Sequence, residues 1–121
     1  MVTNPVVAVV DDDPGVRGSV LSLLRSAGIS GVGFEDAAGL LSRMHAERWA
    51  CVVTDLHMPG MTGLELQSVM ARLGWRLPLI VMTAFPTDAA RRQALDQGAT
   101  AFLTKPLDPD ALLEAVEAVL Q

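Results

Sequence analysis

The chain has 121 residues, half of them apolar and 19% charged, so we expect one domain with a packed core over residues 1–121. The net charge of −5, from 9 basic and 14 acidic residues, argues against nucleic-acid binding, since contacts to phosphates need clustered Lys and Arg. The single cysteine, Cys51, excludes an internal disulfide and a cysteine zinc cluster. No apolar run approaches the roughly 18–20 residues of a membrane span, and no secretory signal is visible. We therefore expect a cytoplasmic chain without membrane contacts.

The apolar pattern in the first part of the chain predicts two strands, each followed by a helix. Val6–Val10 is apolar throughout, as in a strand covered on both faces, and Asp13 with Pro14 starts a helix that ends at Gly28. Glycines interrupt Ser30–Phe34, which predicts a weak strand at the edge of a sheet. The apolar side chains of the second helix are Ala37, Leu40, Leu41 and Met44.

The middle of the chain continues this alternation. Cys51–Thr54 predicts a third strand, which follows Trp49 and ends at Asp55. The segment 62–65, Thr-Gly-Leu-Glu, has the pattern of a capping box and predicts the start of the third helix. Leu79–Thr83 predicts the fourth strand.

The last part predicts a fourth helix from Thr87 to Gly98, a strand at Ala101–Thr104 and a fifth helix that opens at Asp108. Strict alternation of strands and helices predicts an α/β fold, a doubly wound parallel sheet of five strands with helices on both faces. The fourth helix has few large apolar residues, and its apolar side is mostly alanine: Ala89, Ala90, Ala94 and Leu95. Those of the fifth form one stripe of Leu112, Leu113, Val116, Val119 and Leu120.

Polar residues follow four of the five predicted strands. Asp11 and Asp12 follow the first strand, and Asp55 follows the third. Thr83 ends the fourth strand and Lys105 follows the fifth. Ligands of doubly wound sheets bind beyond the carboxyl ends of the strands, so these side chains belong to one candidate site. Carboxylates this close repel one another unless a cation is present, and Mg²⁺ is the cation expected where phosphate is handled.

These residues are also the parts needed to hold a phosphoryl group, which an aspartate can accept as an aspartyl phosphate. Other polar or reactive residues have structural explanations. Asp13 is best explained as a helix cap and Cys51 as a small core residue. His45 and His57 have unlike contexts, so we interpret them as solvated side chains and not as a metal site.

The chain resembles the receiver domains of two-component response regulators over essentially its whole length. Four segments in this order and spacing carry the resemblance: Val9–Asp13, Asp55–Gly63, Val81–Ala84 and Phe102–Pro106. The sequence is chemotaxis-receiver-like, and its loops and last helix are most similar to receivers of the FixJ and NtrC kinds. The resemblance implies a flavodoxin-like (βα)5 fold with strand order 2-1-3-4-5 and a single receiver domain over residues 1–121.

The resemblance also assigns roles to residues of the site. Asp55 matches the phospho-acceptor, and Lys105 matches the lysine that pairs with it and then with the phosphoryl group. Asp11, Asp12 and Asp55, with the backbone carbonyl of His57, match the ligands of Mg²⁺.

Three further positions match the switch of these domains. Thr83 matches the switch hydroxyl, and the backbone amide of Ala84 matches a donor to the phosphoryl group. Phe102 matches the switch aromatic, which rotates into a void that opens on phosphorylation. Phe85 and Pro86 depart from the family pattern, in which polar residues or glycine are common there.

The resemblance implies a phosphorylated signalling domain that is not an enzyme. A sensor histidine kinase or a phosphotransfer protein would donate a phosphoryl group to Asp55 in a Mg²⁺-dependent step. Phosphorylation would then switch the face made by the fourth helix, fifth strand and fifth helix, and so control an output domain or partner. An output domain beyond Gln121 and a phosphorylation-dependent homodimer are both compatible with this prediction.

Two alternatives stay open from the residues. A haloacid-dehalogenase-like phosphatase also uses an aspartate nucleophile with Mg²⁺ on a parallel sheet, but it requires a carboxylate two residues after the nucleophile, where this chain has His57. A pseudo-receiver would be a binding module without phosphotransfer. The presence of both Asp55 and Lys105 argues against it.

Overall fold

The computed structural model describes residues 5–120 and contains one parallel sheet of five strands in the order β2-β1-β3-β4-β5. The strands are β1 (Val6–Val10), β2 (Ser30–Phe34), β3 (Trp49–Asp55), β4 (Leu79–Thr83) and β5 (Ala101–Thr104). The helices are α1 (Pro14–Ser26), α2 (Ala37–Leu41), α3 (Gly63–Arg72), α4 (Asp88–Asp96) and α5 (Pro109–Leu120). The predicted fold class and strand order are confirmed.

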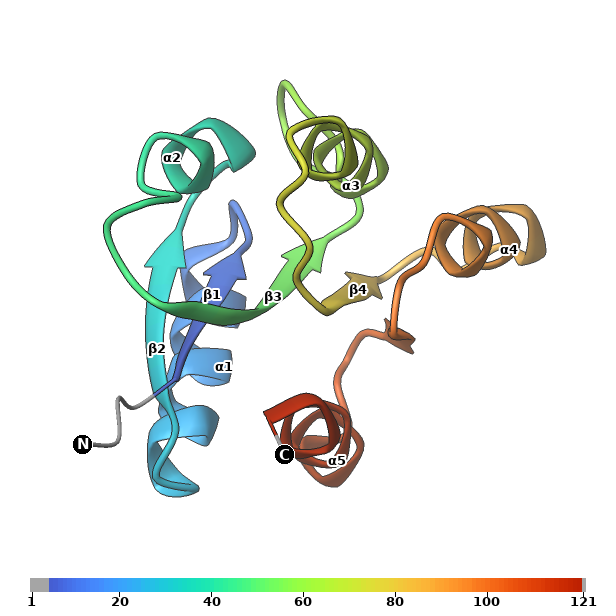
Figure 1. Cartoon of the computed structure of the whole chain (residues 1–121). Coiled ribbons are helices and arrows are strands. Elements are labelled where there is room, and N and C mark those ends of the chain that lie inside the picture. The colour runs from blue at the N-terminus through green and yellow to red at the C-terminus, as the bar shows by residue number, and fades with distance from the viewer. Residues whose placement is uncertain (1–4, 121) are drawn as a thin grey trace.

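The helices cover both faces of the sheet. Figure 1 shows α2, α3 and α4 along one face and α1 with α5 along the other. Each face has its own apolar core, because alternate residues of the same strand point to opposite sides: Val52 packs under α3, and Val53 packs on the face of α1 and α5. The central strands are buried on both faces, which explains their continuous apolar runs.

The helix starts predicted from side-chain caps are confirmed. The Asp13 carboxylate accepts hydrogen bonds from the first amides of α1. Thr62 and Glu65 form a reciprocal capping box at α3, with the Glu65 N–H donating to Thr62 Oγ1 at 3.1 Å. Thr87 caps α4 by accepting from the Ala90 N–H. Each cap satisfies backbone donors that lack a partner inside the helix, and so fixes where the chain leaves the sheet edge.

Two predicted boundaries were wrong. The second helix ends at Leu41, so Met44 lies outside it in a series of turns. Those turns bring the Arg43 carbonyl to the indole of Trp49, whose Nε1–H donates to it at 3.0 Å. Trp49 is the first residue of β3 rather than preceding it, because it pairs with Val6 across an irregularity in the β1–β3 register.

Helix α4 was predicted to use four apolar residues, but only two of them face the core. Ala94 is fully buried and Ala90 is partly buried, one turn apart on the same side of the helix. Ala89 precedes Ala90, and Leu95 follows Ala94, so both side chains point away from the core. Leu95 is 39% exposed. Little apolar area consequently holds α4 against the sheet.

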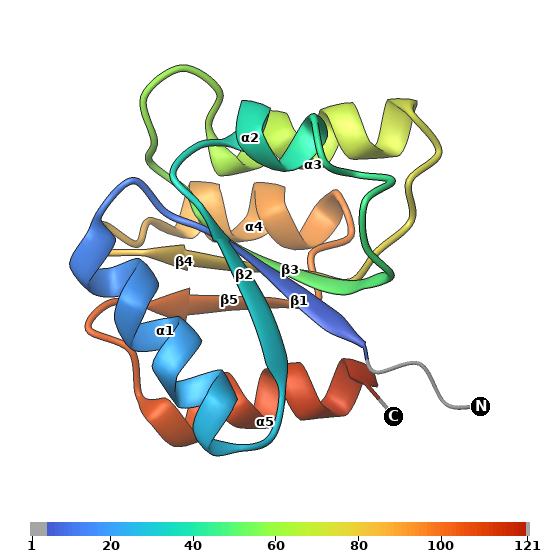
Figure 2. The ribbon, with the colours of Figure 1, turned by 90° about the vertical axis from the view of Figure 1, so that its left-hand side faces the viewer.

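The two ends of the strands define two edges of the sheet. Seen from the side, the loops that follow β1, β3, β4 and β5 gather at the left, and both chain ends lie at the right (Figure 2). We call these the carboxyl edge and the amino edge. Within residues 5–120, no helix combines the length and apolar character needed to cross a bilayer.

Candidate functional site

Three carboxylates meet at the carboxyl edge. Asp11 follows β1 and is fully buried, and Asp55 ends β3 with 6% of its surface exposed. Asp12 is exposed beside them. One carboxylate oxygen from each residue lies within 4.8 Å of the others. The structure thus brings together the three side chains that the sequence predicted as metal ligands.

Lys105 lies between the two buried carboxylates. Its Nζ is 2.8 Å from Asp11 Oδ2 and 3.2 Å from Asp55 Oδ2. The predicted pairing with Asp55 is therefore present, but the shorter contact is to Asp11. The ammonium group offsets part of the negative charge of both carboxylates.

The pKa values of Asp55 and Lys105 reflect this crowding. Burial raises the pKa of Asp55 above its usual 3.8, and the charge of Asp11 raises it further, while Lys105 and the His57 N–H act in the opposite direction. Burial alone would lower the pKa of Lys105, but its hydrogen bonds and charge interactions with Asp11 and Asp55 outweigh burial and raise it. The positive charge of Lys105 therefore does not fully offset the burial of Asp55 and the negative charge of Asp11.

Backbone groups and one arginine hold the carboxylates in place. The Asp13 N–H donates to Asp11 Oδ1 at 2.9 Å, and the His57 N–H donates to Asp55 Oδ1 at 3.3 Å. Arg17 Nη1 donates to the backbone carbonyl of Asp11 at 2.6 Å. Sequence reasoning missed Arg17, which lies one turn into α1 and gives no local signal of this contact.

Gly63 is a second residue whose role at the site was missed. A side chain at this position would place its Cβ 2.6 Å from the backbone oxygen of Asp55 and 3.1 Å from the Cα of Leu56. Only glycine lets the start of α3 approach the end of β3 this closely. The capping box at 62–65 predicted the helix start but not this contact.

The predicted switch residues surround the same edge. Thr83 is fully buried, and its Oγ1 accepts a hydrogen bond from the Phe85 N–H at 3.0 Å. Ala84 is exposed beside it. Phe102 is already buried at 8% exposure in the core under α4, so its expected inward rotation has no exposed starting position in this structure.

Two rings lie at the rim of the site. Phe85 is 72% exposed, and the edge of its ring meets the exposed imidazole of His57 with the ring centres 6.0 Å apart. His45 is exposed on the turns after α2, so the interpretation of both histidines as solvated is confirmed. Cys51 is a core residue, as predicted; burial raises the pKa of its thiol to about 12.

A family comparison identifies the chain. The sequence profile of the response regulator receiver domain matches residues 7–117. The chain belongs to this family. Membership of this family fits the acidic carboxyl edge. The alternative of a haloacid-dehalogenase-like phosphatase is not favoured.

Curated relatives of this receiver domain are longer proteins. Nodulation protein W of Bradyrhizobium diazoefficiens is 35% identical over 98% of this chain and 52% of its own length. Transcriptional regulatory protein FixJ of Azorhizobium caulinodans is 39% identical over 94% of this chain and 54% of its own. The chain spans about half the length of these relatives.

Solved receiver structures superpose closely on this one. A response regulator receiver protein from Pseudomonas putida has a TM-score of 0.92 at 30% identity and covers 98% of this chain and 99% of its own. The structure titled FixJ-N has a TM-score of 0.88, also at 30% identity, over 98% of this chain and 94% of its own. These matches agree with the fold described above.

Proposed function

We propose that Asp55 is the phospho-acceptor of this receiver domain and takes a phosphoryl group from the phosphohistidine of a sensor histidine kinase or phosphotransfer protein. The observation that carries this proposal is the position of Asp55: a buried carboxylate at a strand end, 3.2 Å from the Lys105 ammonium and beside two further carboxylates. The membership of the family supports the same role.

In this reaction an Asp55 carboxylate oxygen attacks phosphorus while the P–N bond to histidine breaks, and the imidazole leaves with the electron pair of that bond. Lys105 already contacts Asp55 and Asp11, so its hydrogen bonds can pass to the phosphoryl oxygens without a large movement. Positioning and neutralisation of charge are the protein's main contributions to such a transfer.

The residues present fit a Mg²⁺ ion. Their oxygen atoms are the ligands that Mg²⁺ prefers, and three carboxylates within 4.8 Å repel one another without a dication. Asp11, Asp12, Asp55 and the backbone carbonyl of His57 would hold it. The bound ion would neutralise phosphoryl oxygens during transfer. Asp12 is the exposed member of this set.

We propose that Thr83 and Ala84 donate hydrogen bonds to the phosphoryl group on Asp55. The Thr83 hydroxyl accepts from the Phe85 N–H, which leaves its own proton available to a phosphoryl oxygen. The backbone amide of Ala84 is a second donor. A pull on these two residues would displace the start of α4, where few apolar contacts resist it. Phe102, packed under α4, would then repack as the switch aromatic.

The domain is proposed to act on itself and not as a turnover enzyme, and residues 1–121 are proposed to form a single receiver domain. Because the curated relatives are about twice as long, we propose an output domain beyond Gln121 in the natural protein. Phosphorylation would control that domain or a homodimer through the face of α4, β5 and α5. We also propose a cytoplasmic location, without direct binding to nucleic acid or membrane.

The test uses intact-protein mass after incubation with acetyl phosphate and Mg²⁺. Wild type and Asp13→Asn, a control that keeps a cap at the same edge, should each gain one phosphoryl group, and Asp55→Asn should gain none. Chelation of Mg²⁺ with EDTA should abolish the gain in wild type. None of the forms should turn over p-nitrophenyl phosphate. An undiminished adduct on Asp55→Asn would assign the acceptor to another residue.

A further inference from the structure

Asp12 differs from the two carboxylates beside it in how it is held. The side-chain hydrogen bonds at the carboxyl edge go to Asp11, Asp13 and Asp55, and none within residues 5–120 goes to the Asp12 carboxylate. Asp12 is exposed, yet one of its oxygens lies within 4.8 Å of an oxygen from Asp11 and one from Asp55. Repulsion from these two carboxylates acts to push the Asp12 side chain outward. The backbone must therefore hold Asp12 in this cluster.

Both peptide groups that flank Asp12 accept or donate a hydrogen bond. On its C-terminal side, the Asp13 N–H donates to Asp11 Oδ1 at 2.9 Å. On its N-terminal side, the Asp11 carbonyl oxygen accepts a hydrogen bond from Arg17 Nη1 at 2.6 Å. Because a peptide group is planar, a bond to its oxygen also fixes the plane that contains the nitrogen and Cα of Asp12. Arg17 thus sets the backbone from which the Asp12 carboxylate projects.

A glycine in β2 makes room for the Arg17 side chain. A Cβ at Gly33 would lie 3.0 Å from Cδ of Arg17 and 3.1 Å from its Cγ, so the aliphatic part of Arg17 lies directly over Gly33. Arg17 is half-buried there, one turn into α1. The next residue of β2, Phe34, accepts the Asp11 N–H at 3.0 Å. Strand β2 therefore supports Asp11 twice, directly at its N–H and through Arg17 at its carbonyl.

The hold of Arg17 on this turn leaves the carboxylate oxygens free. Both ion pairs found within residues 5–120 belong to Lys105, which contacts Asp11 Oδ2 and Asp55 Oδ2. Arg17 donates instead to a neutral backbone carbonyl. A cation on a carboxylate oxygen would have to be displaced by a metal ion, whereas the Arg17 bond can persist when a metal ion binds.

We propose that Arg17 is a positioning residue for the Mg²⁺ ion of this site, an inference that rests on the proposed function. Arg17 holds the Asp11–Asp12 peptide group so that the Asp12 carboxylate is directed into the cluster before the ion binds. Without Arg17, Asp12 would have to be brought back against the repulsion of Asp11 and Asp55 during binding. That cost would weaken binding, as in any site that is not pre-organised.

The test is a titration of the ¹³C,¹⁵N-labelled 121-residue chain with MgCl₂, followed by the backbone signals of the carboxyl edge. Arg17→Met keeps the aliphatic part of the side chain and removes the guanidinium, and it should weaken Mg²⁺ binding by about fivefold or more. In the metal-free protein, the carbonyl ¹³C signal of Asp11 and the amide ¹⁵N signal of Asp12 should also shift, because their shared peptide group loses a hydrogen bond.

The matched control is Arg25→Met, which removes an exposed cation from the same helix. It should leave the Mg²⁺ Kd and both signals unchanged. A loss of stability alone would not change the Kd, because the titration observes the folded protein.

Gly33→Ala separates the position of Arg17 from its charge. The new Cβ displaces the aliphatic part of Arg17 and leaves the guanidinium charge in the protein. Mg²⁺ binding should weaken by about twofold or more. The same substitution in Arg17→Ala, which has no long side chain to displace, should leave the Kd of that variant unchanged.

The outcomes separate this inference from the proposed function. Wild type that binds no Mg²⁺ would overturn the proposed metal site and this inference with it. Wild type that binds Mg²⁺ while Arg17→Met binds it as tightly would overturn the inference alone. A Gly33→Ala substitution that leaves the Kd of wild type unchanged, or that weakens binding equally in Arg17→Ala, would also overturn it, because the position of Arg17 would then not be the cause.

Discussion

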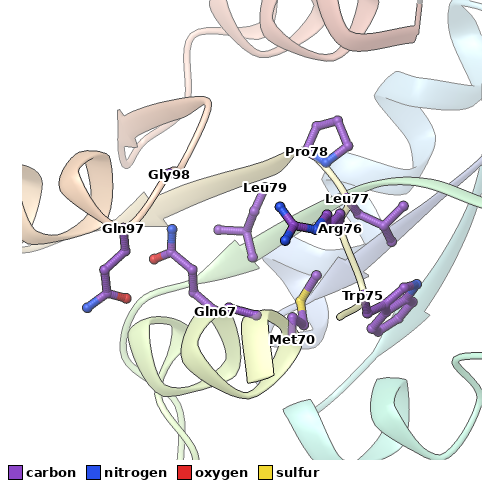
Figure 3. A pocket seen from close by; sticks show the side chains of 10 residues that line it. Gln67, Met70, Trp75, Arg76, Leu77, Pro78, Leu79, Gln97 and Gly98 are labelled. Carbon is purple, nitrogen blue, oxygen red and sulfur yellow. The ribbon is translucent and has the colours of Figure 1, made fainter. Parts of the chain in front are cut away.

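The two edges of the sheet differ in whether their buried polar groups have hydrogen-bond or ion-pair partners. At the carboxyl edge, Asp11 and Asp55 are buried charges. Lys105 donates a hydrogen bond to Asp11 and forms an ion pair with Asp55, and each carboxylate also accepts a hydrogen bond from a backbone amide. At the amino edge, Gln67 is neutral and buried, and its oxygen has no donor among residues 5–120 (Figure 3). A buried charge without partners is far more costly than a buried amide oxygen without one, which explains why both buried carboxylates have Lys105 and a backbone N–H beside them.

The carboxyl edge also has one part that is free to move. Its carboxylates are fixed by short backbone and side-chain bonds, and Gly63 holds α3 tightly against β3. Beside them α4 buries only Ala94 fully. A rigid acidic site next to a weakly held helix is suited to convert a local change of charge into a movement of the helix.

The largest effect is expected from Gly63→Ala. The new Cβ would lie 2.6 Å from the Asp55 carbonyl oxygen, so backbone at the site must shift. Urea denaturation should show a loss of about 2 kcal/mol or more in the free energy of unfolding. The control is Gly18→Ala in α1, where a Cβ meets nothing within 4 Å and should stabilise the helix by about 0.5–1 kcal/mol. Equal effects at both positions would show that the close approach does not matter.

Lys105→Met removes the ammonium between Asp11 and Asp55. Their carboxylates would then face each other without a cation, and at neutral pH the free energy of unfolding should fall by about 2 kcal/mol. This is below the usual loss for a fully buried pair, because the lysine side chain is 15% exposed. Added Mg²⁺ should restore part of the loss by binding the folded state. The control is Arg72→Met, which removes an exposed cation on α3 and should change the free energy of unfolding by less than about 0.5 kcal/mol. If Arg72→Met lost as much stability as Lys105→Met, the position of Lys105 between the two carboxylates would not be the cause of the loss.

Asp55→Asn should give a smaller change that depends on pH. The folded protein holds the proton of Asp55 more tightly than the unfolded chain, because its pKa is raised above 3.8. Ionisation of Asp55 therefore lowers the stability of wild type as the pH rises from 3.8 through the raised pKa. The Asn variant should be the more stable protein at neutral pH, and its advantage should vanish below pH 3.8. Denaturation at a series of pH values checks this; an advantage independent of pH would contradict it.

The smallest effect is expected in tryptophan emission. Trp75 lies in the loop between α3 and β4, at the amino edge, and should not respond when Mg²⁺ binds at the opposite edge. Trp49 starts β3 at the amino edge, but its ring meets Phe34, whose carbonyl accepts the Asp11 N–H at 3.0 Å. We expect little change on addition of Mg²⁺, and any change should survive in Trp75→Phe and be lost in Trp49→Phe. A large quench that survives in Trp49→Phe would mean that the two edges are coupled.

Local patterns in the sequence predicted the fold well. The strands predicted at Val6–Val10 and Leu79–Thr83 match the observed strands residue for residue, because strands buried on both faces have nearly continuous apolar residues. Asp13 and Thr62 marked helix starts because a cap acts within three residues of itself. The gathering of Asp11, Asp55 and Lys105 followed from the rule that parallel strands end at one edge.

Contacts between segments far apart in the chain follow from the packing of the folded protein and not from local patterns. That Lys105 lies nearer to Asp11 than to Asp55, that Gly63 must lack a side chain, and that Leu95 faces solvent all depend on how helices and strands are turned against one another. The same holds for Gln67, whose amide nitrogen donates to the Ala94 carbonyl across 27 positions of sequence, while its oxygen is buried without a donor among residues 5–120. A sequence specifies which residues are apolar, capping or charged, whereas distances of a few ångströms between distant segments arise only when the whole core packs at once.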